Sequence, residues 1–214
     1  MVRVYREEIE NLLLNTGREN IEKLIEHMDE NGFFTAPCSG SFHLAYEGGL
    51  AEHSLNVCNM AFRLFETFKQ DGIEEKGVTE ESIIIASILH DLGKMGQFGK
   101  SNYVPNMLKG RATKANPNPE PYQSEKKPFI TNPELLYVDH EIRSIQIASQ
   151  FIELTEEESF AILNHNGMYS NLRYAYSGKE RPLNLIIHWA DMWAARVIEA
   201  ENTYNDDKEG EKDV

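Results

Sequence analysis

Cysteine and long apolar runs are scarce in this chain of 214 residues. The two cysteines, Cys38 and Cys58, form neither a CxxC metal motif nor the paired framework of a small secreted domain. No apolar run approaches the roughly 20 residues that a membrane-spanning helix needs. Residues 1–14 are acidic and lack the apolar core of a signal peptide. We therefore expect a cytoplasmic protein that is not embedded in a membrane.

Positive charge is also in short supply. Lysine and arginine total 21 against 35 aspartates and glutamates, which gives a formal net charge of −14. This balance disfavours a surface that coats nucleic acid, because basic side chains must neutralise the phosphate backbone. It still allows a small basic pocket. We expect a small ligand and no extended nucleic-acid surface, and the sequence leaves open whether the chain forms a homo-oligomer.

Helical periodicity dominates the chain, and strand signals are few. We predict a single all-α domain over residues 1–203, followed by an acidic tail over 204–214. A stretch at about 96–138 is rich in Pro, Asn and Lys, which predicts a long irregular insertion within the domain. Helices are expected at about 5–14, 18–30, 49–70, 79–91, 139–153 and 155–163, and again from about 182.

Three of these helices carry an ionisable side chain where a core residue would be expected. His53 lies on the apolar stripe of one helix, His90 and Asp91 end the apolar run of the next, and Asp191 interrupts the apolar face of the last. A single buried histidine is usually a hydrogen-bonded core residue. Three helices that each carry such a side chain favour a single partner bound by all of these side chains, such as a metal ion. Imidazole and carboxylate ligands suit Zn, Fe, Mn, Co or Ni, so we predict one or two divalent ions, with Mg as a further candidate.

The order of these residues resembles that of the HD-domain metal-dependent phosphohydrolases. FHLAYEGGLAEHSLNV, around His53, is similar to the segment around the first histidine in exoribonucleases of the YhaM type. HDLGK resembles the core motif of the family, and HWADMWAAR resembles the segment around its last aspartate. The resemblance covers roughly residues 42–200. It implies an HD-domain helical bundle with a central divalent metal, whose ligands are His53, His90, Asp91 and Asp191.

The resemblance also implies a second metal ion. Many members use two further histidines between the HD pair and the last aspartate, and His140 and His165 stand in suitable places, with Asp91 bridging both ions. The alternatives are an exposed histidine at a helix start for His140 and a histidine stabilised by a helix C-terminus for His165. Gly49 stands where members with three metals have glutamate. No GYP motif follows His165, so a three-metal enzyme that cleaves cyclic di-GMP is not expected.

The activity that the resemblance implies is hydrolysis of a phosphate ester or anhydride in a nucleotide-like substrate. A metal-activated hydroxide would attack phosphorus, with Asp91 and Lys94 as the catalytic side chains. Lys94, one turn after His90, is expected either to contact a phosphate oxygen or to remain solvated. An HD-fold di-iron oxygenase and a non-catalytic nucleotide sensor are the competing functions.

The insertion carries a local positive patch within an acidic protein. Because it follows the HD motif directly, we expect a basic lid over the metal site that attracts a phosphorylated substrate. Lys109 and Arg111 are its candidate substrate contacts, and Tyr103, Tyr122 or Phe129 could stack on a base. A solvated surface loop or an oligomer contact is the alternative interpretation.

Five other polar residues near these motifs have weaker assignments. His43 is expected near the pocket mouth, and His188 is expected to be a core histidine or to support a ligand. Glu52 precedes His53 and Glu141 follows His140 in the sequence, but we expect both side chains to point away from the metal site. Arg196 is expected to pair with an acidic neighbour and not with substrate.

Overall fold

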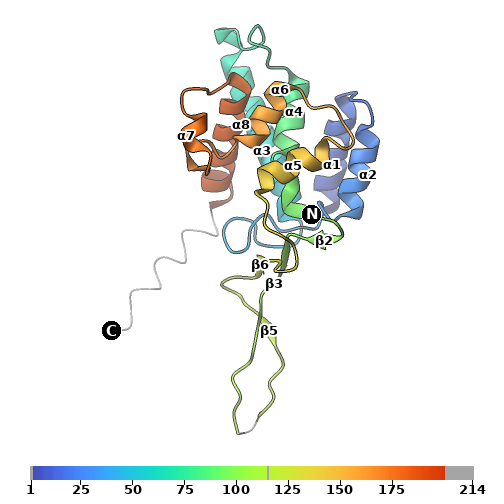
Figure 1. Ribbon diagram of the computed structural model, residues 1–214, viewed down its shortest axis with the longest axis vertical. Helices are drawn as coiled ribbons and strands as arrows, with labels where there is room; N and C mark the ends of the chain where they lie inside the picture. The colour runs from blue at the N-terminus through green and yellow to red at the C-terminus, as the bar shows by residue number, and fades with distance from the viewer. Residues whose placement is uncertain (1, 115, 201–214) are drawn as a thin grey trace, which may run out of the picture.

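A computed structural model describes residues 2–114 and 116–200 as a helical bundle with one projecting arm (Figure 1). The chain is about 52% helical and 7% strand, which confirms the all-α prediction. The predicted acidic tail lies outside the described residues. None of the described helices combines the length and apolar character needed to cross a bilayer. The helices are α1 (Val2–Asn15), α2 (Ile21–Glu30), α3 (Gly49–Phe68), α4 (Glu80–Leu89), α5 (His140–Ala148), α6 (Glu156–Leu163), α7 (Arg173–Tyr176) and α8 (Pro182–Trp193), with short 3₁₀ turns η1 (Lys69–Asp71), η2 (Leu92–Met95) and η3 (Gly167–Tyr169).

The core of the bundle surrounds α4. Every residue from Ser82 to Leu89 is buried, as expected for a helix that is apolar on all sides. Helices α1, α3, α6 and α8 pack around it. Thr79 begins the helix through a capping box: its Oγ1 accepts from the Ser82 N–H at 3.0 Å, and its own N–H donates to Ser82 Oγ at 3.0 Å. The helix ends at Leu89, so His90 and Asp91 lie at its C-terminal end in the centre of the bundle.

Helix α8 begins where the sequence predicts, with Pro182 in its first turn. It packs against α3, α4 and α6, and its residues Ile186, Ile187 and Ala190 are buried. Beyond Trp193 the helix widens into a π-helical segment, η4 (Ala194–Ile198), in which the Glu199 N–H donates to the Ala194 carbonyl at 3.0 Å. This change of helix type affects which of the last residues face the interior.

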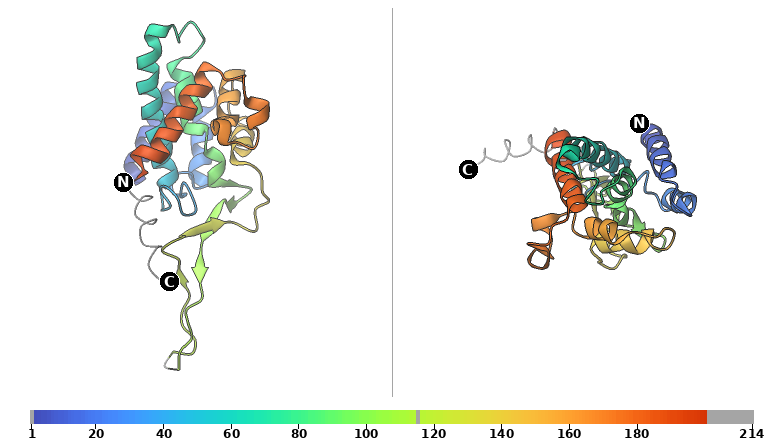
Figure 2. Two further views of the ribbon diagram at one scale, coloured as in Figure 1. Left: turned by 90° about the vertical axis from the view of Figure 1, so that its left-hand side faces the viewer. Right: turned by 90° about the horizontal axis from the view of Figure 1, so that it is seen from above.

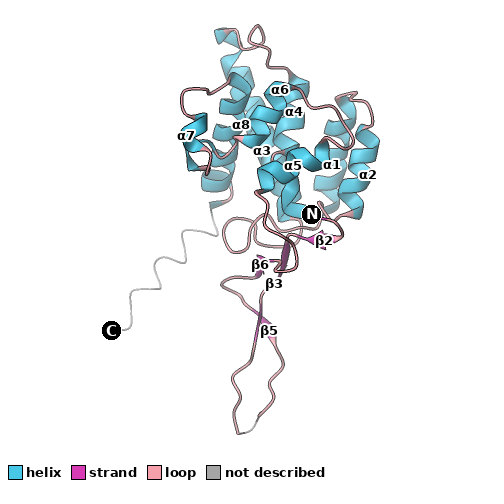
Figure 3. Ribbon diagram, viewed as in Figure 1, coloured by secondary structure: helices cyan, strands magenta, loops and turns pink. Residues whose placement is uncertain are grey.

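The insertion predicted at about 96–138 is largely irregular but also contains short strands that the sequence does not indicate. The segment forms three two-stranded antiparallel ladders, β1–β2, β3–β6 and β4–β5, which Figure 3 shows as the magenta elements outside the bundle. Strands of two or three residues are too short to produce a period-two pattern, so the sequence carries no signal for them. The strands are β1 (Gly96–Gln97), β2 (Lys100–Ser101), β3 (Tyr103–Pro105), β4 (Met107–Leu108), β5 (Tyr122–Gln123) and β6 (Phe129–Thr131).

The insertion is an arm and does not form a closed lid. Its base is held against the bundle, where the Phe129 N–H donates to the Gly40 carbonyl at 3.1 Å. From β4 to β5 the arm projects away from the helices, and the side view in Figure 2 shows the same separation. The base of the arm therefore lies beside the HD motif, whereas its outer half extends away from the bundle.

Gly93 allows the HD motif to approach α5 closely. A Cβ at this position would lie 2.3 Å from the His140 carbonyl oxygen and 3.0 Å from the Ser144 backbone nitrogen. The Gly93 N–H also donates to Ser144 Oγ at 2.8 Å, and Ser144 Oγ donates to the His90 carbonyl at 2.9 Å. These contacts fix the distance between the end of α4, which His90 and Asp91 follow, and the start of α5, where His140 lies.

Candidate metal centre

Four helices and the turn after α6 bring the six predicted ligands together. His53 comes from α3, His90 and Asp91 follow α4, and His140 begins α5. The loop after α6 and helix α8 supply the remaining two. Within this cluster, nitrogen and carboxylate atoms from His53, His90 and Asp191 lie within 4.8 Å of one another, as do those from His90, Asp91 and His165. The six predicted ligands are His53, His90, Asp91, His140, His165 and Asp191.

One pair of histidines faces nitrogen to nitrogen. The Nε2 atoms of His53 and His90 are 3.3 Å apart. His90 Nδ1 lies 2.7 Å from the Ser87 carbonyl, which only accepts hydrogen bonds, so Nδ1 carries the proton. His53 Nδ1 likewise lies 3.0 Å from the Glu199 carboxylate. With both protons on Nδ1, the two Nε2 lone pairs point into the same space, which is the arrangement that a shared cation stabilises.

The surroundings of His53 favour positive charge at this point. Burial opposes a charged imidazole, but Cys38, Asp191 and Glu199 outweigh burial and hold the pKa of His53 well above its ordinary value. Asp191 Oδ1 is 3.2 Å from His53 Nε2. Although burial opposes ionisation of Asp191, its hydrogen bond with His53 and the charge of His53 hold its pKa below the usual range. A proton or a metal ion can supply the charge that these carboxylates favour.

A second pair of histidines repeats this geometry. The Nε2 atoms of His140 and His165 are also 3.3 Å apart. His165 Nδ1 donates to the Ile162 carbonyl at 2.8 Å, and His140 Nδ1 lies 3.3 Å from a Glu141 carboxylate oxygen. Burial, and then the charge of His90, lowers the pKa of His165 to about 3. His165 is therefore a neutral imidazole, the form that binds metals.

Asp91 lies between the two histidine pairs. Its Oδ2 is 3.5 Å from His53 Nε2 and 3.4 Å from His90 Nε2. Its Oδ1 is 3.1 Å from His140 Nε2 and 3.6 Å from His165 Nε2. Burial opposes ionisation, but Lys94 and His90 hold the pKa of Asp91 well below its usual range. The two oxygens of one carboxylate thus serve two separate donor clusters.

The donor set fits a pair of divalent cations. Asp91 Oδ1 is buried and has no hydrogen-bond partner among the residues that the structure describes, so its approach to His140 is not a hydrogen bond. An orphaned carboxylate oxygen in a buried site is costly unless a cation satisfies it. One cluster offers His53, His90, Asp91 and Asp191, and the other offers Asp91 with two histidines. Mixed nitrogen and oxygen ligands of this kind suit first-row transition metals.

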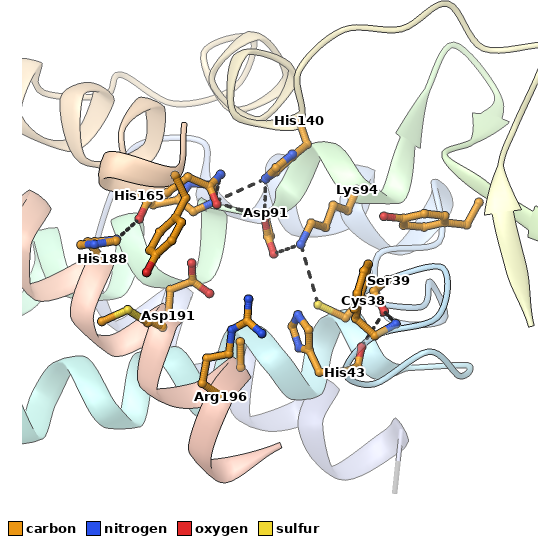
Figure 4. Close-up of a pocket in the computed structure, with 16 residues that line it drawn as sticks. Cys38, Ser39, His43, Asp91, Lys94, His140, His165, His188, Asp191 and Arg196 are labelled. Carbon is orange, nitrogen blue, oxygen red and sulfur yellow. Dashed lines mark hydrogen bonds and ion pairs between the residues drawn. The ribbon is translucent and has the colours of Figure 1, made fainter. Parts of the chain in front are cut away.

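A pocket of about 610 Å³ opens onto this cluster (Figure 4). Lys94 lies on its wall, with Nζ 2.6 Å from Asp91 Oδ2 and 3.9 Å from Cys38 Sγ. His188, which lines the same pocket, donates through Nδ1 to the His165 carbonyl at 2.7 Å. His188 is therefore a hydrogen-bonded histidine that contacts the backbone of a predicted ligand, which is compatible with both interpretations given for it. The pocket is lined by Cys38, Ser39, Phe42, His43, Asp91, Lys94, Tyr103, His140, His165, Asn166, Tyr169, His188, Asp191, Met192, Ala195 and Arg196.

The outer arm does not reach this pocket. Tyr103, in β3 at the base of the arm, is part of the lining, whereas Lys109 and Arg111 are exposed and lie just beyond β4. The interpretation of the whole insertion as a lid is therefore corrected, because its hairpin geometry directs the basic residues away from the bundle. In this structure Lys109 and Arg111 are not positioned as pocket contacts.

Two further expectations about side chains are wrong. Glu141 was expected to point away from the site, but it accepts from Asn166 Nδ2 at 2.6 Å and lies beside His140 Nδ1. At the start of a helix, its long side chain folds back over the preceding residue. Arg196 was expected to pair with an acidic neighbour, yet no carboxylate partner is found for it within residues 2–114 and 116–200. Glu52 bonds Tyr46 and stays away from the cluster, as predicted.

Glu199 is a site residue that the sequence interpretation missed. Its side chain is 1% exposed, and its carboxylate accepts from His53 Nδ1 at 3.0 Å, from His43 Nδ1 at 2.5 Å and from Asn56 Nδ2 at 3.0 Å. Burial opposes ionisation, but the bonds from His43 and His53 hold the pKa of Glu199 below its usual range. Glu199 therefore fixes the orientation and tautomer of a predicted ligand. Asp191 and Glu199 are eight residues apart, a spacing that a broad α-helical face allows, but the sequence does not indicate the π-helical segment between them.

We expect Glu199→Gln to weaken metal binding by about 10- to 100-fold, the usual effect of losing a carboxylate behind a ligand histidine. The glutamine keeps the size of the side chain but removes the charge that orients His53. The measurement is a metal titration against a competing chelator. Glu52→Gln, on the same helix as His53, is the matched control. Equal metal affinity in the two variants would show that Glu199 does not support the site.

A family model described as HD domain matches residues 50–196. This range contains all six predicted ligands. No match is found among curated proteins or among solved structures.

Proposed function

Because the chain belongs to the HD domain family, whose members are generally metal-dependent phosphohydrolases, we propose that it hydrolyses a phosphate ester or anhydride of a nucleotide-like substrate. The observation that carries this proposal is the pair of facing histidine clusters that share Asp91. The narrower resemblance to exoribonucleases of the YhaM type stays a prediction, since no matching relative tests it.

The proposed ligands are the six residues of the cluster, and bound divalent ions would supply Lewis acidity that activates water and neutralises phosphate charge. Asp91 holds its carboxylate between the two histidine pairs, and Ser87 and Ile162 hold His90 and His165 in the tautomer that leaves Nε2 free for a ligand bond. Asp91 in turn holds the Lys94 ammonium at the pocket wall. Lys94 is proposed to contact a phosphate oxygen and to stabilise developing negative charge.

The walls of the pocket support a substrate with an aromatic part. Phe42 and Tyr169 line the pocket and are 70% and 79% exposed, so their rings are available to a ligand. Aromatic side chains can stack on a nucleobase without excluding any of the common bases. The volume of the pocket lies within the range of sites that take small ligands. These features support a nucleotide over a bare phosphate ester.

The experiment that tests this function is product analysis by chromatography. The wild-type protein and its Asp91→Ala variant would be incubated with nucleoside mono-, di- and triphosphates, dinucleoside polyphosphates, cyclic nucleotides and short oligonucleotides, with Mn, Co, Ni, Fe, Zn and Mg tried separately. We expect release of phosphate or a nucleotide product by the wild type only. Absence of turnover in protein of confirmed metal content would contradict the proposal.

The same preparation separates the two competing functions. An iron-loaded, coloured protein that consumes O₂ without releasing phosphate would support the di-iron oxygenase. Nucleotide binding without turnover would support the sensor. Lys94, a half-buried cation directed at the shared carboxylate, favours phosphate binding over the oxygenase, and turnover distinguishes the hydrolase from the sensor.

A further inference from the structure

Arg196 lies at the pocket without a carboxylate to neutralise it. Figure 4 shows its guanidinium between Asp191 and His43, pointing into the cavity. The acidic groups around it already have partners. Asp91 Oδ2 is 2.6 Å from Lys94 Nζ, and Asp191 Oδ1 is 3.2 Å from His53 Nε2. The described lining residues include one lysine, Lys94, and one arginine, Arg196. Lys94 forms an ion pair with Asp91, whereas Arg196 forms none with the residues that the structure describes.

The π-helical segment brings Arg196 to the same side as Asp191. In a regular α-helix, residues five apart are separated by about 140° around the axis. The Glu199 N–H donates to the carbonyl of Ala194, five residues earlier, as in a π-helix. This bond widens the turn and reduces the angle between Asp191 and Arg196 around the helix axis. Both Asp191 and Arg196 therefore line the pocket, while Glu199 reaches His53 from behind. Segments of this kind are rare and occur frequently at functional sites.

We infer that Arg196 binds a phosphate group of the substrate other than the one attacked at the metal centre, so that the pocket prefers nucleotides with two or more phosphates. This inference rests on the proposed function, which assigns the reacting phosphate to the metal ligands and Lys94. A guanidinium offers a fork of donors that matches two phosphate oxygens at once. Met192 and Ala195, its neighbours in the lining, offer no competing acceptor in their side chains.

The test is a comparison of 5′-mono-, di- and triphosphates of one nucleoside, which is the nucleoside found by the substrate panel or adenosine if none is hydrolysed. Four proteins are compared: wild type, Arg196→Ala, Arg196→Lys and Arg173→Ala. Arg173 is an exposed arginine outside the pocket, so its variant controls for the loss of one positive charge. Free metal is held constant with a metal buffer, because di- and triphosphates bind divalent ions in solution.

We expect Arg196→Ala to lower kcat/KM for the di- and triphosphate by about 10- to 100-fold, the size of a lost charge-assisted bond. The value for the monophosphate should stay within about twofold. Arg196→Lys should restore part of the loss, since it keeps the charge without the fork. Arg173→Ala should match the wild type. An equal loss for all three nucleotides, or no loss for any, would overturn the inference.

Calorimetric titration separates this inference from the proposed function. If the wild type hydrolyses none of the nucleotides, the function is wrong, but binding of the mono- and diphosphate to the metal-loaded protein still tests Arg196. Tighter binding of the diphosphate by wild type, and not by Arg196→Ala, supports the second phosphate site. Equal dissociation constants for the two nucleotides in the wild type overturn it.

Discussion

Replacing Asp91 with alanine is expected to abolish metal binding and to lower phosphate-ester turnover by about 10³-fold or more, since ligand groups that act together lose nearly all activity when one is removed. Asp91 is the one described carboxylate that lies against both histidine pairs, with Oδ2 3.4 Å from His90 and Oδ1 3.1 Å from His140. Its removal takes an oxygen from both clusters and also releases Lys94. Metal content by mass spectrometry and turnover on the identified substrate are the measurements.

Two further variants keep this prediction testable. Asp91→Asn preserves the size of the side chain, so it is informative if the alanine variant fails to fold. Asp71→Ala removes an exposed carboxylate from η1 and should retain full metal content and turnover. Circular dichroism checks that each variant is folded. If Asp91→Ala unfolds and Asp91→Asn does not, the metal contributes to stability. Full metal content in folded Asp91→Ala would contradict the assignment of this cluster.

Replacing His165 with alanine is expected to lower the metal content from two ions per chain to one. His165 Nε2 faces His140 at 3.3 Å and is 3.6 Å from Asp91 Oδ1, the oxygen that also approaches His140. The cluster of His53, His90 and Asp191 keeps its nitrogen and oxygen donors. Turnover should fall by more than about 100-fold, since loss of a direct ligand exceeds the usual effect of losing its supporting partner.

Equilibrium dialysis followed by metal analysis counts the ions in each variant. His27→Ala is the matched control, because His27 packs its ring against Phe151 at 4.8 Å and is not part of the pocket lining. His53→Ala should give the reciprocal result and retain an ion at the other cluster. Two ions retained in His165→Ala would mean that the second cluster is assigned wrongly. A single ion in the wild type would mean that the two clusters share one site.

The helical architecture was predictable from local sequence because burial imposes a period on each helix. The apolar run before His90 indicates a helix that is buried on all sides, and every residue from Ser82 to Leu89 is buried in the structure. Thr79 and Thr155 are residue types favoured at helix starts, and both form capping boxes. Each of these features depends on residues only a few positions apart, so the chain carries the signal without any tertiary information.

The ligand candidates were predictable for a related reason. A histidine or aspartate on an apolar stripe must be satisfied by something, and His53, His90 and Asp191 each stood on such a stripe. The structure brings these three within 4.8 Å of one another. That they bind metal is a proposal which the metal analyses above test.

Other parts of the site had no local signal. Arg196 lines the pocket and Glu199 reaches His53 across a segment in which the helix widens after Trp193, and the sequence does not indicate this change of helix type. Glu141 meets Asn166 across two elements that are 25 residues apart in sequence. The strands of the arm are two or three residues long, which is too short for a period to be recognised.

The sequence by itself determined the helical class, the caps, and the set of histidines and aspartates that compete with the apolar core, because these follow from burial and hydrogen bonding within one helix. Only the tertiary structure decided that Asp91 directs one oxygen to each histidine pair, that Glu199 supports His53, and that the basic arm projects away while Arg196 enters the pocket. These arrangements depend on distances between elements far apart in the chain, and on one change of helix type, which no local pattern encodes.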